Sequence, residues 1–231
     1  MPPEGLQAKK SRAQRILALL EQAYPDAKIA LHFNNPLELL VATILSAQCT
    51  DERVNQVTAS LFKKYRTAKE YAETGQATFE AEIHSTGFYK AKARSIIGMA
   101  RALLERHRGR VPETLDELVE LPGVGRKTAN VVLGNAFGQD ALAVDTHVFR
   151  VSQRLGLAKS DDPDKIEAQL TALIPRSHWT AATHLLITHG RRTCYARKPD
   201  CPGCAVRALC PWPEKTATGR VGKVQQRPRR R

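Results

Sequence analysis

Helical patterning is the feature that most limits how this chain can fold. Apolar residues recur at the spacing of helix faces along almost the whole sequence, and no segment shows the alternation of a half-buried strand. Residues 37–45, Leu-Glu-Leu-Leu-Val-Ala-Thr-Ile-Leu, are apolar on nearly every face, which predicts a central buried helix. The pattern predicts an all-α protein of roughly ten helices.

Local capping signals predict where these helices begin and end. Asn35, followed by Pro36, predicts the start of the buried helix, and Asp51 is expected to cap the next one. Thr114 and Glu117 form the pattern of a capping box. The other expected starts and stops, in chain order, are Tyr89, Gly109, Gly125, Gly138, Asp145, Gly156, Asp162, Trp179 and Gly190.

The charge balance indicates a polyanionic partner. Lysine and arginine number 36 against 23 aspartate and glutamate, a net charge of +13 with a pI near 9.8. Nucleic acid is the first candidate and an anionic membrane surface the second. No run of about 18 apolar residues is present, so no membrane span is expected. The N-terminus lacks the apolar core of a secretory signal, which favours a cytoplasmic, nucleoid-associated protein.

The stretch Leu121–Ala129 reads as a hairpin between two helices. Gly123 and Gly125 are expected to permit positive φ and to leave no Cβ in the way of an approaching backbone. The helix that follows would present its N–H groups and positive dipole end, which suit a phosphate. A glycine turn between two packed helices is the alternative. The basic Arg126 and Lys127, on a basic chain, favour DNA binding.

Lys127 and Asp145 are the candidate catalytic residues. A lysine on the first turn of a helix lies in positive potential, which favours the uncharged amine, a nucleophile that can form a Schiff base with a sugar. Contact with a phosphate is the simpler role for Lys127. Asp145 stands at an expected helix start, where a plain N-cap needs no further function. A carboxylate near a reacting sugar would also stabilise oxocarbenium-like charge.

Four cysteines lie together between residues 194 and 210. In a reducing compartment this crowding indicates metal ligation rather than disulfides. Structural zinc usually takes two short Cys pairs across a longer loop, whereas the gaps here are six, two and five residues. An iron–sulfur cluster and zinc are both open on spacing alone. Cys49 reads as a small core residue. The ligand candidates are Cys194, Cys201, Cys204 and Cys210.

Together these motifs resemble the endonuclease III family of the helix–hairpin–helix glycosylase superfamily, over about Arg15 to Cys210. The matching stretches are Leu45–Asp51, Leu121–Asn130, Val144–Arg150, His189-Gly190 and the four cysteines. The resemblance implies two all-α domains with a DNA-binding cleft between them. One is a six-helix barrel over residues 30–142; the other joins residues 6–29 to residues 143–212 and holds a [4Fe-4S] cluster. Residues 213–231 would form a flexible basic tail, which either touches phosphates or is solvated without a role.

The resemblance implies a bifunctional DNA glycosylase/AP lyase of base excision repair, acting as a monomer on double-stranded DNA with oxidised pyrimidines or abasic sites. The damaged nucleotide would be flipped out of the stack. Lys127 would attack the sugar's anomeric carbon and displace the base. Asp145 would stabilise the developing charge and manage the lysine proton. The Schiff base would then allow β-elimination on the 3′ side of the lesion.

Other site residues follow by position in the family's motifs. Gln48 matches the glutamine that enters the gap left by the flipped nucleotide. Phe88 stands where the family usually has an aliphatic wedge, or else is a core residue. Asp51 is assigned to the base pocket. The remaining expected DNA contacts are Gly123, Val124, Gly125, Arg126, Thr128, His147, Arg150, Arg197 and Lys198.

Three rival functions are distinguishable. A monofunctional, adenine-removing relative generally lacks the hairpin lysine, so Lys127 counts against it. A DNA-binding module that lost its chemistry would not be expected to keep both Lys127 and Asp145. A zinc-stabilised nucleic-acid binder would be excluded by metal analysis.

Overall fold

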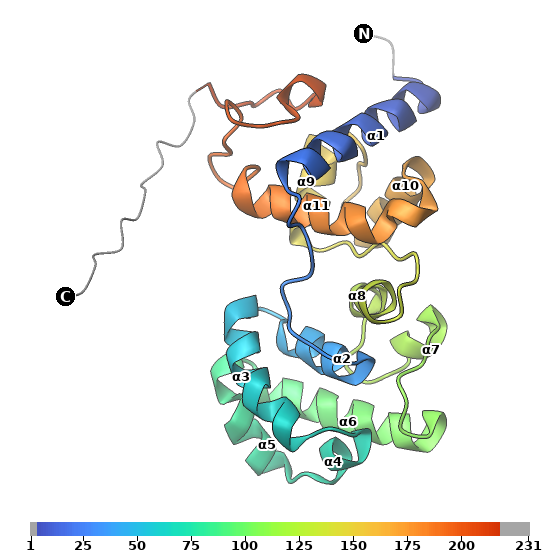
Figure 1. Cartoon of the computed structure of the whole chain (residues 1–231), viewed down its shortest axis with the longest axis vertical. Helices are drawn as coiled ribbons and strands as arrows, with labels where there is room; N and C mark the ends of the chain where they lie inside the picture. Colours follow the sequence, from blue (N-terminus) through green and yellow to red (C-terminus); the bar gives the residue numbers. More distant parts are fainter. Residues whose placement is uncertain (1–3, 218–231) are drawn as a thin grey trace, which may run out of the picture. The chain divides into compact units, whose positions relative to one another are not determined.

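The computed structural model describes residues 4–217, and these residues form helices joined by turns and loops, with no strand among them (Figure 1). The predicted all-α fold class is confirmed. The basic tail predicted over residues 213–231 lies mostly outside the described residues. The α-helices are α1 (Leu6–Ala23), α2 (Pro36–Leu45), α3 (Asp51–Lys64), α4 (Ala68–Glu73), α5 (Gln76–Ile83), α6 (Tyr89–His107), α7 (Leu115–Val119), α8 (Arg126–Ala136), α9 (Thr146–Arg154), α10 (Pro163–Leu173) and α11 (Trp179–Arg192). Short 3₁₀ turns occupy His84–Thr86, Arg176–His178 and Arg207–Leu209.

Packing divides the described chain into two compact units. The first contains the described residues up to 27, residues 144–174 and the described residues from 184 onward. The second contains residues 28–143 and 175–183. The segment 175–183 was expected with the cysteines, but side chains attach it to the second unit. Thr180 Oγ1 donates to the Ala141 carbonyl (3.1 Å), and Thr183 Oγ1 accepts from the Ala143 N–H (3.1 Å).

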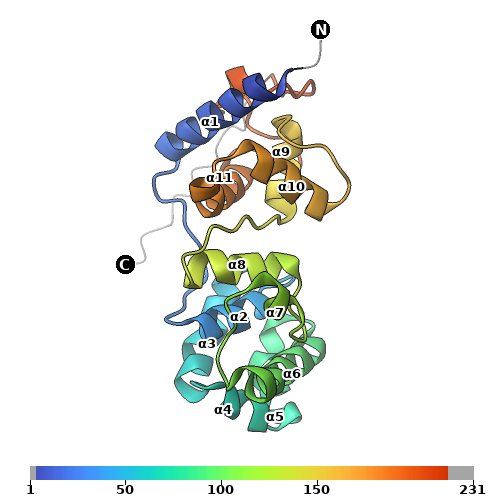
Figure 2. The ribbon, with the colours of Figure 1, turned by 90° about the vertical axis from the view of Figure 1, so that its right-hand side faces the viewer.

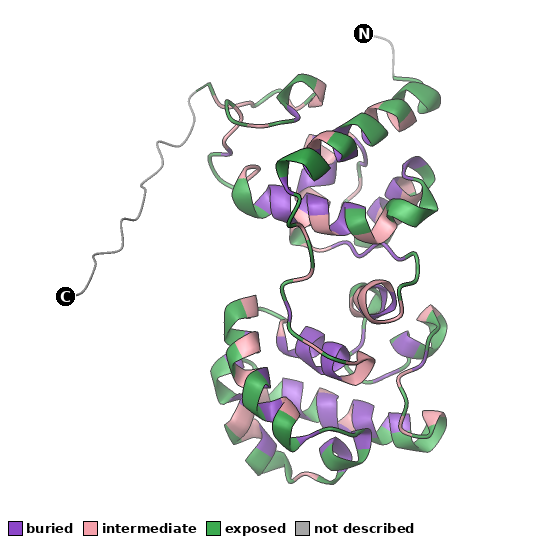
Figure 3. Ribbon diagram, viewed as in Figure 1, coloured by how far each residue is buried: buried purple, intermediate pink, exposed green. Residues whose placement is uncertain are grey.

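The second unit is built around α2, whose residues from Glu38 to Leu45 are all buried, as the apolar pattern predicted. Asn35 caps this helix by accepting from the Glu38 N–H at 2.9 Å. α2 packs against α3, α6 and α8, and α4 and α5 cover α6 (Figure 2). Figure 3 shows the buried faces of α2 and α6 turned into this core. The large side chains that fill it include Leu39, Leu40, Leu45, Tyr71, Phe79, Ile83, Ile96, Met99 and Leu103.

The first unit joins the two ends of the described chain. The buried face of α1 carries Ala13, Ile16, Leu17 and Leu20, at the spacing of one helix face. Arg12 fixes α1 to segments far along the chain, because its guanidinium donates to the carbonyls of Leu155 (2.6 Å) and Leu209 (3.2 Å). Residues from both ends of the sequence therefore share one core.

Several helix ends differ from the prediction. Thr50, not Asp51, caps α3 by accepting from the Arg53 N–H. Asp51 is the first helical residue, where its negative charge interacts favourably with the positive end of the helix dipole. Gly190 lies inside α11 instead of ending it. A glycine is required at this position because His147 and Arg150 pack closely against it. The two helices α4 and α5 were not predicted at all. The described residues contain no helix long and apolar enough to span a bilayer.

Candidate functional site

The hairpin turn between α7 and α8 is rigidly packed at its first glycine. Gly123 has φ +78, and a Cβ there would lie 2.5 Å from the Cβ of Ser95 on α6. The Val124 N–H donates to the Leu121 carbonyl at 3.0 Å, and the Val124 side chain is buried. Val124 therefore anchors the turn in the core, and its side chain does not face outward as a DNA contact would.

The second glycine of the hairpin has a different task. Gly125 was expected to adopt positive φ, but it is extended, with φ −91, and serves as the N-cap of α8. A Cβ there would have no described atom within 4 Å, so the glycine leaves open space beside the helix start. No side chain of the described residues caps α8. Its first turn thus presents the positive end of the helix dipole, with Arg126 and Lys127 exposed and Thr128 half-buried.

Gln48 and Phe88 lie in two turns of the second unit. Both are exposed, Phe88 to 65%, so Phe88 is not a core residue. Both also adopt the left-handed conformation, with φ +53 and φ +49. This conformation costs a residue with a side chain about 1–2 kcal/mol, and such strain is frequent at functional positions. Asp51 follows the Gln48 turn as the half-buried first residue of α3.

Asp145 caps α9 in the first unit. Its Oδ1 accepts from the N–H groups of His147 (2.8 Å) and Val148 (2.7 Å), which fixes the carboxylate at the positive end of the helix. Both bonds use Oδ1, so capping does not require the second oxygen. Lys127 belongs to the second unit and Asp145 to the first, so each is positioned by the packing of its own unit.

His147 and Arg150 pack against Gly190 of α11. A Cβ at Gly190 would lie 2.9 Å from His147 Nδ1 and 3.1 Å from the Arg150 guanidinium. The Arg150 guanidinium lies 3.2 Å from His147 Nδ1. Arginine can only donate, so this nitrogen accepts. Burial is the main cause that lowers the pKa of His147, which keeps the ring neutral near pH 7.

Arg150, an expected DNA contact, makes hydrogen bonds within the protein. Its guanidinium donates to the carbonyls of Gly190 (3.0 Å) and Cys194 (3.1 Å), and it is half-buried. Arg150 therefore ties α9 to the start of the cysteine segment. Arg197 and Lys198 are exposed in the loop that follows, and Lys198 has φ +50.

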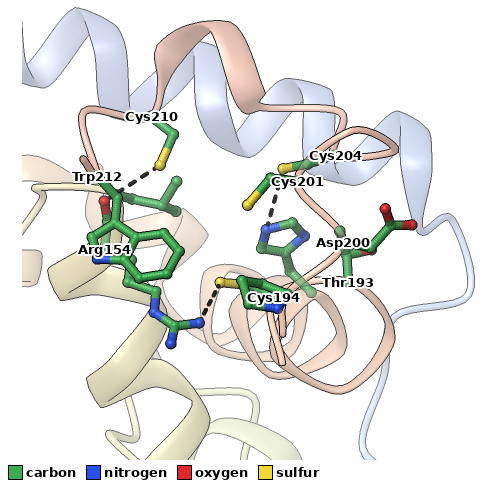
Figure 4. A pocket seen from close by; sticks show the side chains of 11 residues that line it. Arg154, Thr193, Cys194, Asp200, Cys201, Cys204, Cys210 and Trp212 are labelled. Atoms are coloured by element: carbon green, nitrogen blue, oxygen red, sulfur yellow. Dashed lines mark hydrogen bonds between the residues drawn. The ribbon is translucent and has the colours of Figure 1, made fainter. Parts of the chain in front are cut away.

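The four predicted ligand cysteines line one pocket of about 310 Å³, including the open space at its mouth. Figure 4 shows the side chains of Cys194, Cys201, Cys204 and Cys210 arranged around this space. All four are unpaired thiols of intermediate burial. Within residues 4–217, no three His, Cys, Asp or Glu side chains form a group that would hold a single metal ion.

Two side chains from outside the cysteine segment support this pocket. Arg154 donates to the carbonyls of Tyr195 (2.6 Å) and Ala196 (2.9 Å), lies 3.5 Å from Cys194 Sγ, and stacks on the ring of Trp212. His189 Nε2 lies 3.8 Å from Cys204 Sγ, and its Nδ1 is hydrogen-bonded to Tyr24 of α1 at 3.0 Å. Burial lowers the pKa of His189 to about 4, so its ring is neutral.

The donor set fits an iron–sulfur cluster. Burial raises the pKa of the Cys204 thiol to about 11 and also raises that of Cys210, so the thiolates need a positively charged partner. A cationic inorganic group bound by four sulfurs supplies such a partner. The neighbouring Arg154 and the neutral His189 can donate to sulfur, which is the usual surrounding of cluster ligands.

Sequence reasoning assigned no role to four residues that organise these sites. Arg154, His189 and Tyr24 act through carbonyls or side chains far away in the sequence, so no local motif marks their roles. Lys92 lies in a lysine-rich stretch typical of a solvated helix face, yet it is 5% exposed. An isolated basic residue on the apolar face of α6 is the one signal that could have singled it out.

Comparisons with known proteins agree with this arrangement. A family model described as "HhH-GPD superfamily base excision DNA repair protein" matches residues 41–176. Endonuclease III of Synechocystis sp. (strain ATCC 27184 / PCC 6803 / Kazusa) is 52% identical over 205 residues, 88% of this chain and 94% of that protein. Endonuclease III of Escherichia coli (strain K12) is 44% identical over 206 residues, 89% of this chain and 98% of that protein.

The solved structure of a trapped Endonuclease III-DNA covalent intermediate is also similar. Its TM-score is 0.84 at 46% identity, covering 87% of this chain and 95% of that one. The family model spans more than half of the chain, and the relatives extend over nearly all of it. The chain therefore belongs to the endonuclease III family, within the HhH-GPD superfamily of base excision DNA repair proteins.

Proposed function

We propose that this chain is a bifunctional DNA glycosylase/AP lyase, which removes oxidised pyrimidines from double-stranded DNA and then nicks the strand by β-elimination. The observation that carries the proposal is the exposed Lys127 on the uncapped first turn of α8, directly after the glycine turn. The trapped covalent DNA intermediate of a family member supports a nucleophile of this kind.

Lys127 acts as the nucleophile. Its uncharged amine attacks C1′ of the damaged nucleotide, and the C1′–N bond breaks with its electron pair leaving on the base. The base takes up a proton, and the attacking nitrogen gives up a proton to Asp145. The lone pair of Nζ then expels the ring oxygen O4′ from C1′, O4′ takes up a proton, and the ring-opened sugar remains joined to Nζ as a protonated Schiff base. This iminium acidifies the C2′ proton, whose removal expels the 3′ phosphate.

Asp145 stabilises the positive charge that develops on the sugar as the base leaves. Its position at the start of α9 holds the carboxylate through the N–H groups of His147 and Val148. The oxygen that capping does not use serves the reacting sugar and moves the lysine proton.

The DNA backbone is held by main-chain N–H groups and by basic side chains. Gly125 leaves room for a phosphate at the start of α8, beside Arg126 and Thr128. Arg197 and Lys198 contribute a second basic surface. Gln48 fills the gap left by the flipped nucleotide, and Phe88 inserts as an aromatic wedge. Asp51, three residues after Gln48, belongs to the pocket for the damaged base, and His147, two residues after Asp145, to the DNA contacts.

Cys194, Cys201, Cys204 and Cys210 would hold a [4Fe-4S] cluster. When bound, the cluster supplies a rigid four-point tie for the 194–210 segment. Arg154 fixes the loop that carries Arg197 and Lys198, so a stable loop and a DNA-binding surface come together. The protein acts as a nucleoid-associated monomer.

Borohydride trapping on a duplex with one thymine glycol tests the proposal. Wild-type protein and a Lys165→Ala control, which alters an exposed lysine of α10, should both form a covalent adduct. Lys127→Ala should form none and should still bind the duplex. Base release by the wild type without an adduct would identify a monofunctional, water-using enzyme. Binding with neither adduct nor release, across several oxidised pyrimidines, would identify a non-catalytic DNA-binding module.

A further inference from the structure

Lys92 is a buried lysine that the proposed chemistry does not use. It lies in the first turn of α6 and is 5% exposed. Its Nζ donates to two main-chain carbonyls, those of Leu45 at 2.7 Å and Thr86 at 2.8 Å. Burial lowers the pKa of this lysine. Its charged end therefore points into the protein, toward the ends of two other elements.

Both carbonyls belong to residues where a helix stops. Leu45 is the last residue of α2 and Thr86 the last of the 3₁₀ turn His84–Thr86. Carbonyls at helix ends lack intrahelical partners. After α2 the chain turns tightly, and the Cys49 N–H donates to the Ser46 carbonyl rather than to that of Leu45. Lys92 supplies the donor that each of these ends needs.

The two turns that begin at these carbonyls carry Gln48 and Phe88. Gln48 follows Leu45 by three residues, and Phe88 follows Thr86 by two. Both are exposed and left-handed, which requires a surrounding structure that holds the backbone in place. The main-chain N–H of Lys92 also donates to the Phe88 carbonyl at 3.1 Å. That bond is the regular first hydrogen bond of α6, whereas the Lys92 side chain adds the tie that joins the start of the Phe88 turn to the start of the Gln48 turn.

We propose that Lys92 is a positioning residue, which sets the separation and direction of Gln48 and Phe88 so that both can enter the duplex at one flipped nucleotide. This inference rests on the proposed function. Lys92 itself is buried and touches no DNA. Two side chains that insert at one lesion must keep a fixed spacing, and a shared tie between their turns provides it. An apolar side chain of similar length would fill the volume but leave both carbonyls without a donor.

The test compares two duplexes that differ in how much work flipping requires. In the first, thymine glycol is paired with adenine; in the second, the same lesion lies in a bulge and is already unstacked. Single-turnover base release is measured for wild type, Lys92→Met and Lys90→Met, an exposed lysine of the same helix. Lys92→Met should slow base release from the paired duplex about ten- to hundredfold, because misplacement of the inserting side chains by about 1 Å can lower a rate by that much. The rate of base release from the bulged duplex should change less than threefold. Lys90→Met should keep the wild-type ratio of the two rates.

A second comparison separates positioning from general damage. Lys92→Met is combined with Gln48→Ala and Phe88→Ala. When both inserting side chains are absent, Lys92→Met should add no further loss on the paired duplex. An equal loss on both duplexes, or a full additional loss in the combined variant, would overturn the proposal.

Folding of each variant is checked by circular dichroism and thermal melting. If Lys92→Met does not fold, Lys92→Gln takes its place, because the shorter side chain cannot hold both carbonyls. An unchanged ratio of rates in Lys92→Gln would also overturn the proposal. A wild-type protein inactive on both duplexes would instead refute the proposed function, so the two failures are distinguishable.

Discussion

The hairpin and insertion turns of the second unit differ from the cysteine segment of the first in how they are held. In the second unit, the turns depend on main-chain conformation and on one buried side chain. Gly123 turns at φ +78 against Ser95, Gln48 and Phe88 adopt left-handed backbone, and Lys92 ties the starts of these last two turns together. Their side chains, and that of Lys127, remain exposed. In the first unit, side chains do the holding. Arg150 and Arg154 donate to carbonyls of residues 190–196.

This difference separates residues proposed to contact DNA or to react with it from residues that hold the protein backbone in place. A turn held by its backbone and by a buried side chain from outside the turn leaves its own side chains exposed and available for DNA. The carbonyls of a segment without regular structure need hydrogen-bond donors from neighbouring elements. Basic side chains whose sequence position suggests a DNA contact can therefore serve as these donors. Arg150 shows this, because its sequence position suggests a DNA contact and its hydrogen bonds indicate a scaffold.

The largest effect is expected at Asp145, which both caps a helix and is proposed to stabilise the reacting sugar. Asp145→Asn keeps an N-cap but removes the charge, so unfolding free energy should stay within about 0.5 kcal/mol of wild type. Glycosylase rate should fall about 10²–10³-fold, because transition-state charge loses its partner. Urea unfolding and single-turnover kinetics measure the two. Asp145→Ala serves as the comparison and should lose about 1 kcal/mol of stability as well. Activity of Asp145→Asn equal to wild type would leave Asp145 as a cap only.

The two glycines of the hairpin should respond oppositely to alanine. Gly123→Ala forces a Cβ against Ser95 at positive φ and should destabilise the protein by about 2–4 kcal/mol. Gly125→Ala enters open space at negative φ and should cost below about 1 kcal/mol. Its Cβ would obstruct a phosphate, however, and should weaken DNA affinity about tenfold. Thermal melting and fluorescence anisotropy measure these effects. Unchanged DNA affinity in Gly125→Ala would show that no DNA phosphate binds at the start of α8.

Arg154 and Arg197 provide a matched pair in the first unit. Arg154→Met leaves two loop carbonyls without donors and should destabilise the protein by about 1–3 kcal/mol. Purified protein should also contain less iron, measured by metal analysis and visible absorbance. Arg197→Met removes an exposed charge from the same loop, so it should keep its iron and bind DNA with a weaker salt dependence. The reverse pattern would show that the division between supporting and acting residues is wrong for this loop.

The smallest effect concerns His147. Its folded pKa is lowered, so the unfolded chain takes up a proton first as the pH falls below about 6.5. Stability should therefore decline from pH 6.5 downward, by at most about 1.4 kcal/mol per pH unit, and be independent of this group above pH 7. His147→Gln should reduce the decline in urea midpoints measured between pH 7 and pH 5, and the part that remains belongs to other groups such as His189, whose pKa burial lowers to about 4. A decline of equal size in His147→Gln would assign it to other groups.

Much of the fold followed from local chemistry. The buried helix α2, its Asn35 cap, the ends of α6 and the capping role of Asp145 depend on residues close in sequence, so pattern and propensity sufficed. The short helices α4 and α5 were missed because six or eight residues carry little periodicity, although Thr67 and Glu70 do form a complete capping box.

The supporting residues of the sites could not be read in this way. Gly190 was predicted to end a helix, because the sequence does not reveal that His147 and Arg150 pack against it. Lys92 joins carbonyls 47 and 6 residues away, and the longer of these contacts exists only after folding. Residues that touch a substrate occur in recognisable motifs, whereas residues that hold the motifs are identified by tertiary contacts.

The sharing of the first unit between both ends of the chain sets an order in time. Arg12 of α1 can donate to the carbonyl of Leu209 only after that residue, 197 positions further along, has been synthesised. At a translation rate of roughly 5–20 residues per second, the ribosome needs about 10 to 40 s to cover that distance. During this interval the core of the second unit, formed largely by residues 31–141, is already synthesised. The cysteine-bearing unit is therefore completed after the second unit, and Arg12 lacks its Leu209 partner for that whole interval.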